Sequence, residues 1–397
     1  MVIPLHTGIT ANGKWNGMTN VPGSMLRRTL FWMHLATGLA ACFFILVMSV
    51  TGALLTYEHQ ILEAAARRNH VELPAGMQRQ SADQLARVAT LNLPRDARLT
   101  MILDAEPAAP VTINVGRDAA LLLHPYTGAV LPDASASWRA FFATIESWHR
   151  WLGGEPRSAG ANLLDAANLM FLFLVISGSY LWLPAVWRWR TLRGLMLPQR
   201  SYLNSKLRDF NWHHVFSFWM LIPLLLIAAS GVVMSYGWAN NLVYAAYGEA
   251  PPQRPAPPGG RPPAGSPPQR DSGEPGPRAS AQALLTAAAA QVTDWQRLSL
   301  PLDTAPRVSV TAEVAAGGPR PQRRTIVLSS TDATVLEAPA NGPAAQSPGQ
   351  RARVWFRFVH TGEQYGLIGQ TLAGLASLAA CLLVYTGVAL AWRRLIR

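Results

Sequence analysis

The sequence predicts an α-helical membrane protein with four transmembrane helices arranged as two parallel repeats, each carrying an external α+β domain. Three observations lead to this fold class: four long, nearly uncharged segments, basic residues concentrated beside them, and short motifs that recur at nearly constant offsets. Half of the 397 residues are hydrophobic and only 14% are charged. This composition is typical of a membrane protein with sizeable soluble loops.

Four apolar segments are long enough to cross a bilayer, which takes about 20 residues in helical conformation. We predict transmembrane helices at residues 30–57, 161–187, 213–238 and 360–392. Buried helices of a soluble protein are the alternative, but four segments of this length favour a membrane. The first segment is too long for a signal-peptide core and has no obvious small-residue cleavage site, so we expect it to remain uncleaved.

The net charge of +12 is concentrated beside the apolar segments. The basic residues that flank them on one side are Lys14, Arg27, Arg28, Arg188, Arg190, Arg193, Arg200, Lys206, Arg208, Arg393, Arg394 and Arg397. Only Asp209 opposes them in these segments, and the rest of the chain is nearly neutral. Because basic flanks face the cytoplasm, we expect both termini and the 188–212 loop to be cytoplasmic and the two long loops to be external. This placement favours a lipid bilayer over nucleic acid as the partner.

The two external loops resemble each other in sequence. "SADQL" at Ser81 matches "SAQAL" at Ser280, "RLTMILD" at Arg98 matches "RLSLPLD" at Arg297, and "LLLHPYTGAVL" matches "IVLSSTDATVL". Each set predicts a short helix followed by alternating strands and a hairpin turn. We therefore expect one small α+β domain at residues 58–150 and another at 279–350, the second preceded by a Pro/Gly-rich linker at 250–278.

The apolar segments repeat as well. "TGALLTYEHQI" ends the first and "SGVVMSYGWAN" ends the third, while "ISGSYLW" and "YTGVALAW" occur in the second and fourth. His34 precedes Gly52 by 18 residues, and His213 precedes Gly231 by 18. The unit of helix, external domain and helix is thus written twice in the same orientation, as in parallel repeats related by an axis along the membrane normal. The cytoplasmic segments are residues 1–29 and 188–212.

The repeat pairs four histidines at two depths. His34 corresponds to His213 near the cytoplasmic face, and His149 corresponds to His360 near the external face. Such pairs could bind haem iron, bind another metal, relay protons or bond to the backbone. Haem fits because its iron takes two axial imidazoles, which facing helices of a bundle can supply. Zinc would want further ligands nearby. Small residues at i+4 that would leave room for the macrocycle are Gly38, Gly153 and Ser217; His360 has Gln364 there instead.

Two other histidines are alternative ligands. His214 is adjacent to His213, but the repeat register favours His213. His59 could replace the outer ligand, although Trp238 occupies the equivalent position in the third helix. Cations that could bind haem propionates are Arg28, Lys206 and Arg208 on the inner side, and Arg150, Arg157, Arg353 and Arg357 on the outer side. The cysteines Cys42 and Cys381 form no CxxC or CxxCH motif, so covalent haem attachment is unsupported.

Several motifs together resemble the PepSY-associated transmembrane-helix family. They are "HLATGLAACFFILVMSVTGALLTYE", "WHRWLGG", "HHVFSFW", "HTGEQYG" and "HPYTGAVL", and the resemblance covers roughly residues 25–397. His124 stands where the family's D-P-x-T-G-x-V-L hairpin has aspartate, and the second copy, "SSTDATVL", lacks its Gly and Pro. The resemblance implies an iron-regulated protein of the bacterial inner membrane with periplasmic domains. It also supports His34, His149, His213 and His360 as ligands of two b-type haems.

The resemblance implies a di-haem oxidoreductase that passes electrons across the membrane to a ferric siderophore in the periplasm. A peptide- or protease-binding regulator anchored in the membrane is one alternative, and a quinol-linked haem oxidoreductase with a non-iron acceptor is another. A transporter is disfavoured, because no helix centre carries a charge and Pro223 alone suggests a kink. The electron donor, either a quinol or a cytoplasmic reductase, is unidentified, because no nucleotide or flavin motif is present.

Overall fold

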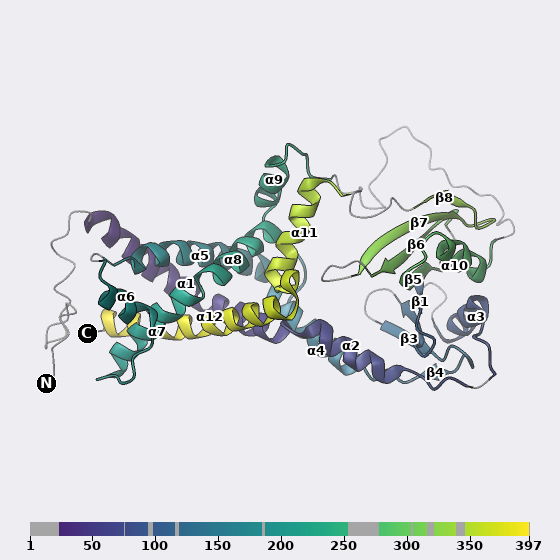
Figure 1. The fold of residues 1–397 in the computed structure, drawn as a ribbon, viewed down its shortest axis with the longest axis horizontal. Coiled ribbons are helices and arrows are strands. Elements are labelled where there is room, and N and C mark those ends of the chain that lie inside the picture. Colours follow the sequence, from purple (N-terminus) through teal and green to yellow (C-terminus); the bar gives the residue numbers. More distant parts are fainter. Residues whose placement is uncertain are drawn as a thin grey trace. The chain divides into compact units, whose positions relative to one another are not determined.

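The computed structural model describes residues 24–74, 76–93, 98–115, 119–184, 187–252, 278–302, 305–315, 321–338 and 346–396. The chain divides into two compact units. The helical unit contains the described residues up to Glu58, Phe141–Pro251 and those from Pro348 onward; the sheet unit contains His59–Ala140 and the described residues from Pro252 to Ser347 (Figure 1). The predicted linker at 250–278 and the start of the predicted 1–29 segment lie largely outside the described residues.

The helical unit is built from long apolar helices and shorter connecting ones. Its helices are α1 (Ser24–Leu55), the end of α4 (Ala136–Trp151), α5 (Ala159–Trp182), α6 (Trp189–Met196), α7 (Ser205–Trp219), α8 (Leu221–Ser235), α9 (Gly237–Ala245), α11 (Pro348–Thr361), the 3₁₀ turn η4 (Glu363–Tyr365) and α12 (Gly366–Leu395). The spans that are long and apolar enough to cross a membrane are Met25–Asn69, Ala159–Trp182 and Glu363–Leu395, with α7 and α8 as a fourth if they count as one. The protein is thus of helical membrane type, with three or four candidate spans among the described residues.

The third predicted span is bent. The helix predicted over 213–238 consists of α7 and α8, whose axes differ by 68°. Pro223 explains the position of the bend, because its nitrogen cannot bond the Trp219 carbonyl and its ring crowds that carbonyl. The kink suggested by Pro223 is confirmed.

The fourth predicted span is interrupted. The single helix predicted over 360–392 is instead the end of α11, the turn η4 and α12. Gly362 and Gly366 adopt φ of 76° and 60°, which side chains rarely tolerate, so the backbone leaves the helix there despite its continuous apolar pattern. A similar break follows His149, where Leu152 and Gly153 have φ of 55° and 78° between α4 and α5.

The long helices form a bundle. α1 packs against α5 and α12, and α7 and α8 pack against the same two helices, so α1 faces the α7–α8 pair across the bundle (Figure 1). Small buried residues, including Ala41, Ala167, Ala376 and Ala380, allow close approach of the helices. Phe171 packs against both apolar clusters to which these alanines belong.

Charged side chains fasten one end of the bundle. The buried Asp209 of α7 accepts hydrogen bonds from Arg208 (2.8 Å) and from Arg393 of α12 (2.7 Å). Arg27 of α1 donates to the carbonyl oxygens of Leu181 and Leu183 at the end of α5, each at 2.9 Å. Cations at a helix C-terminus satisfy its last carbonyl groups and complement the helix dipole.

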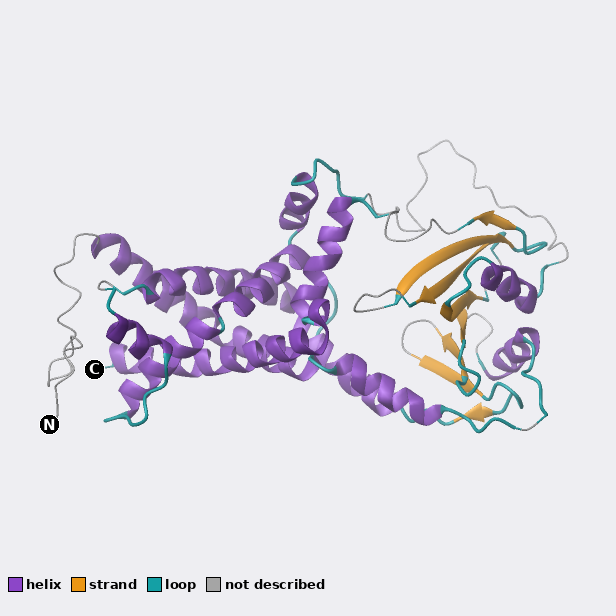
Figure 2. Ribbon diagram, in the orientation of Figure 1, coloured by secondary structure: helices purple, strands orange, loops and turns teal. Residues whose placement is uncertain are grey.

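The sheet unit contains one continuous antiparallel sheet (Figure 2). Its strands are β1 (Leu99–Asp104), β2 (Val111–Val115), β3 (Ala119–Leu123), β4 (Val130–Leu131), β5 (Trp295–Pro301), β6 (Arg307–Val314), β7 (Gln322–Ser329) and β8 (Val335–Glu337), and its helices are α2 (Glu58–Ala66), η2 (Arg67–Asn69), α3 (Ala82–Asn92), α10 (Ala281–Ala290) and the start of α4. The strand order is β4-β3-β2-β1-β5-β6-β7-β8.

The two regions predicted as external domains share one sheet. β1 and β5 pair along their lengths, from Thr100 opposite Pro301 to Asp104 opposite Arg297. Each four-stranded half alone would expose one of these strands as an edge, and pairing satisfies their backbone groups. The two loops therefore contribute to one domain.

Helices α3 and α10 cover one face of the sheet and cap each other. Each begins directly after a serine that the sequence placed at a helix start, Ser81 and Ser280. Gln282 Oε1 accepts a hydrogen bond from the Ala82 amide (2.9 Å), and Asp83 Oδ1 accepts one from the Ala281 amide (2.7 Å). These bonds satisfy amides that a helix start leaves unpaired. One apolar core, which includes Met101, Leu285 and Ile326, runs beneath both helices.

The two hairpin turns differ in their residues but share a left-handed position. In the first, His124 Nδ1 accepts hydrogen bonds from the Tyr126 and Thr127 amides, and Gly128 has φ of 73°. His124 therefore supplies the acceptor that aspartate provides in such turns. In the second hairpin, Ala333 has φ of 58°.

Candidate functional site

The inner histidines lie on α1 and α7, which face each other across the bundle. His34 Nδ1 is 2.9 Å from Ser177 Oγ of α5, and His213 Nδ1 is 2.9 Å from Thr386 Oγ1 of α12. Each imidazole is thus hydrogen-bonded to a flanking helix of the bundle.

The outer histidines lie on α4 and α11. His149 Nδ1 is 2.9 Å from Thr51 Oγ1 of α1, and His360 Nδ1 is 3.1 Å from Ser230 Oγ of α8 and 3.0 Å from the Ile227 carbonyl oxygen. The two ring centroids are 6.2 Å apart, and the ring planes are inclined by 62°. The structure therefore brings His149 and His360 together from segments that are far apart in the sequence.

Glycines let three of these rings lie close to a neighbouring helix. A Cβ atom on Gly178 would lie 3.1 Å from Cε1 of His34, one on Gly52 would lie 3.3 Å from Cε1 of His149, and one on Gly387 would lie 3.6 Å from Cε1 of His213. The two shorter distances are tighter than ordinary contacts, so a side chain at Gly178 or Gly52 would displace the ring. Gly231, the fourth such glycine, packs instead against Asn168.

This donor set fits haem iron. A metal–imidazole bond is about 2 Å long, so two such bonds and two half-rings place ring centres about 6 Å apart, close to the spacing of His149 and His360. All four rings use Nδ1 for the hydrogen bonds described above, which leaves Nε2 available to a metal. In the part of the chain that the structure describes, no group of three or more His, Cys, Asp or Glu side chains gathers as metal ligands. Pairs of imidazoles suit haem, whose macrocycle supplies the other ligands.

The alternative ligands are placed differently. His214 Nδ1 donates to the Phe210 carbonyl of its own helix (2.9 Å), and its ring lies 4.1 Å from that of Phe210. Each of the four paired histidines bonds a residue on another helix. In α7 this is true of His213, which bonds Thr386. His59 lies in α2 and belongs to the sheet unit.

The basic residues suggested for haem propionates divide into engaged and exposed ones. Arg208 donates to Asp209, Arg150 to Glu146 (2.7 Å), and Arg353 to Asn240 (2.8 Å). The exposed ones are Arg28, Lys206, Arg157 and Arg357.

Two small residues that the sequence placed beside a macrocycle have other surroundings. A Cβ on Gly38 would meet only Leu174, at an ordinary 3.8 Å. Gly153 has φ of 78° and lies against Trp148, so it is needed for the turn that ends α4.

Sequence reasoning missed the four hydroxyl residues that bond the histidines. They are Thr51, Ser177, Ser230 and Thr386, and each directly precedes one of the glycines described above. Each predicted span therefore carries one of these Ser/Thr–Gly dipeptides inside motifs that the sequence comparison had already aligned. These dipeptides are visible in the sequence, but the histidines that the hydroxyl residues bond lie on other helices.

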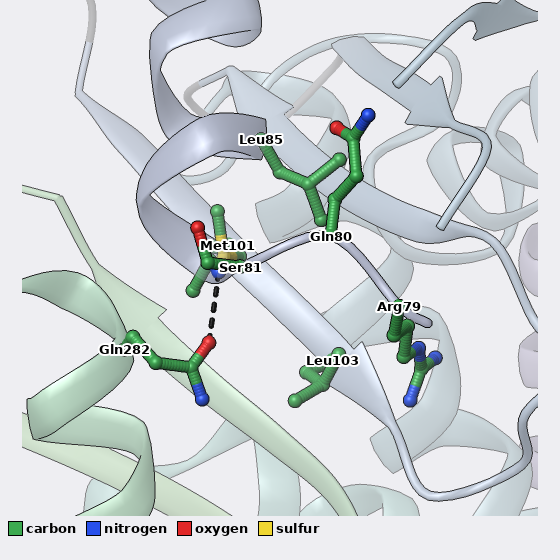
Figure 3. Close-up of a pocket in the computed structure, with 8 residues that line it drawn as sticks. Arg79, Gln80, Ser81, Leu85, Met101, Leu103 and Gln282 are labelled. Carbon is green, nitrogen blue, oxygen red and sulfur yellow. Dashed lines mark hydrogen bonds between the residues drawn. The ribbon is translucent and has the colours of Figure 1, made fainter. Parts of the chain in front are cut away.

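The sheet unit contains a separate cavity of about 270 Å³ between α3, β1 and α10 (Figure 3). Leu85, Met101 and Leu103 form its apolar lining. Arg79 at its rim donates to the carbonyl oxygen of Asp104 at 3.2 Å. The sequence analysis did not predict a binding site at this cavity.

A model of the protein family described as the PepSY-associated TM region matches residues 31–394, most of the chain. No curated protein matches the chain. The family resemblance inferred from the motifs is confirmed.

Proposed function

The chain belongs to the PepSY-associated TM family, and from its two histidine pairs we propose that it is a di-haem b-type oxidoreductase of the bacterial inner membrane. It passes electrons across the membrane and reduces a ferric siderophore in the periplasm. His34 and His213 hold the inner haem, and His149 and His360 hold the outer one. The observation that carries this proposal is the 6.2 Å separation of the His149 and His360 rings, with Nδ1 of each already bonded to the protein.

Each bound haem would supply reversible one-electron Fe(III)/Fe(II) chemistry. His34 with His213 and His149 with His360 would each hold one haem, and two protein ligands to each iron would favour electron transfer over oxygen binding. Along α1, 17 residues separate His34 from Thr51, the partner of His149. At about 1.5 Å of rise per residue, the two proposed sites would lie about 25 Å apart along the helix. Apolar residues, including Phe171 and Ile45, pack in the bundle between these levels.

Two features support an external acceptor for the outer site. His149 and His360 lie on helices that end just before α5 and α12 begin, so both are at one end of the apolar bundle. The basic flanks predict that the opposite end, with His34 and His213, faces the cytoplasm. A water-soluble ferric chelate would then approach the outer site from the periplasm, and a quinol or a cytoplasmic reductase would serve the inner one.

The first test is the haem content and spectrum of the purified full-length protein. We expect two non-covalently bound haems per chain and a low-spin spectrum of bis-histidine type. A folded protein without haem would contradict the proposal and favour the membrane-anchored peptide- or protease-binding regulator.

The second test identifies the acceptor. Dithionite-reduced protein, freed of excess reductant under anaerobic conditions, should be reoxidised by a ferric siderophore and remain reduced with the iron-free siderophore. Reoxidation by a quinone but not by ferric chelates would instead favour a quinol-linked oxidoreductase.

A further inference from the structure

Each of the four hydroxyl groups beside the histidines uses its one hydrogen in a bond to its own helix. Each donates to the carbonyl four residues earlier on its own helix: Thr51 to Val47 (2.6 Å), Ser177 to Phe173 (2.7 Å), Ser230 to Leu226 (2.6 Å) and Thr386 to Leu382 (2.8 Å). A hydroxyl has one hydrogen to donate. With that hydrogen on the carbonyl, the hydroxyl oxygen is left to accept from the histidine, which assigns the proton of each imidazole to Nδ1.

His360 gives the same result independently. Its Nδ1 is 3.0 Å from the Ile227 carbonyl oxygen, which can only accept a hydrogen bond. Nδ1 of His360 therefore carries a proton whatever the orientation of the Ser230 hydroxyl, and Nε2 has the lone pair.

At three of the four sites, the glycine after the hydroxyl residue leaves room for the histidine ring. Gly178 and Gly52 leave room for the His34 and His149 rings against the backbone of a neighbouring helix, while Ser177 and Thr51 receive the Nδ1 protons of the same rings. One dipeptide thus fixes both the position of the ring and its protonation. Because α1 carries His34 for the inner site and Thr51 for the outer one, it contributes to both.

We propose that Thr51, Ser177, Ser230 and Thr386 are positioning residues, each of which holds one histidine with its proton on Nδ1 and Nε2 directed to haem iron. This inference rests on the proposed function for the identity of the metal group, but the tautomer follows from the protein's own hydrogen bonds. A neutral hydroxyl acceptor pulls modestly on the Nδ1 proton, which makes Nε2 a better donor to Fe(III). Its loss should weaken haem binding and raise the reduction potential.

The test uses Thr51→Val in the full-length protein, because valine keeps the branched shape and removes only the hydroxyl. We expect the outer haem to dissociate about tenfold more readily into a haem acceptor such as apomyoglobin, and its reduction potential to shift upward. The inner haem should be unaffected. Thr51→Ser restores a hydroxyl and should behave as the wild type does.

Thr56→Val is the matched control. Thr56 lies in the turn directly after α1, and its hydroxyl donates to the Gly52 carbonyl at 3.2 Å without bonding a histidine. It should change neither haem. A Thr51→Val protein that retains the wild-type affinity and potential of the outer haem would overturn the inference while leaving the di-haem proposal intact.

The tautomer can also be read without haem. In ¹⁵N NMR spectra of haem-free protein, assigned with a His149→Ala variant, His149 should show a protonated Nδ1 and an unprotonated Nε2, and Thr51→Val should lose this preference. A proton on Nε2 of His149 in the wild type would contradict the inference whether or not the protein binds haem.

Discussion

His149 and His360 approach each other from two helices that stop within two residues of them: α4 ends at Trp151 and α11 at Thr361. Their ring centroids are 6.2 Å apart. Each ring lies near the end of its own helix and is hydrogen-bonded to a hydroxyl group on another helix, α1 for His149 and α8 for His360. The position of each ring therefore depends on these contacts rather than on the rigidity of its own helix. Each ligand should therefore be separable by mutation.

Removing an outer ligand should remove one haem only. We expect His360→Ala to lower the haem content from two to one per chain, because the remaining imidazole, His149, cannot hold the iron on both faces. His213→Ala should likewise remove the inner haem and spare the outer one. His214→Ala is the control, since that ring bonds its own helix, and it should retain both haems. Two haems in His360→Ala would refute the outer pairing.

A methyl group on Gly178 should disturb the inner site. Gly178→Ala places it 3.1 Å from Cε1 of His34, so the ring must shift and inner haem occupancy should fall. Gly38→Ala is the control, because its methyl would meet Leu174 at 3.8 Å. Both changes raise intrinsic helix propensity by about 1 kcal/mol, so a difference in haem content between them reports on the ring contact. Equal haem content would contradict the predicted role of Gly178.

The second hairpin should gain stability from a glycine. Ala333 has φ of 58°, which is costly for a residue with a Cβ atom. We expect Ala333→Gly to raise the free energy of unfolding of the sheet unit by about 0.5–1 kcal/mol, since glycine's extra flexibility offsets part of the gain. The reverse change in the first hairpin, Gly128→Ala, should destabilise, because the new methyl would lie 2.8 Å from Gln80 Oε1. Denaturant unfolding monitored by far-UV circular dichroism measures both; a destabilised Ala333→Gly protein would count against this reasoning.

Asp133 should make the sheet unit sensitive to acid. Burial acts to raise the pKa of its carboxyl group, but hydrogen bonds from Arg139 and Ser135 outweigh burial and lower the pKa from 3.8 to about 2. A depressed pKa favours the folded protein when the carboxyl is ionised, so this contribution is complete above about pH 4 and is lost as the pH falls towards 2. Asp133→Asn should therefore be less stable than the wild type at pH 6, and the difference should shrink between pH 4 and 2. A difference that does not change with pH would contradict this assignment.

Local sequence patterns predicted the helices and their capping well. The apolar runs gave candidate spans, Ser81 and Ser280 begin the helices expected after them, and Pro223 lies beside the bend between α7 and α8. These features depend on residues within a turn or two of one another, which a sequence displays directly.

Features that depend on dihedral angles or distant partners were harder to predict. The apolar pattern runs on past Gly362 and Gly366, and only their positive φ reveals the break before α12. Gly153 has the spacing of a residue that makes room for a ring, yet it serves a turn. The pairing of β1 with β5 joins strands almost 200 residues apart, which alternation within each strand cannot specify.

The candidate site divides in the same way. The histidines were found because an ionisable residue near an apolar span is conspicuous. Thr51 and Ser177 were not, because a hydroxyl that bonds its own helix is ordinary in a membrane span, and only the structure shows a histidine from another helix bonded to it.

The seam between β1 and β5 has a consequence for how the chain assembles. A shorter polypeptide with only the first four strands would present β1 as an open edge, and a second copy could complete the sheet only at sufficient concentration. Because both halves belong to one chain, the pairing of β1 with β5 is intramolecular. The complete sheet therefore forms equally well in a cell that holds few copies of the protein.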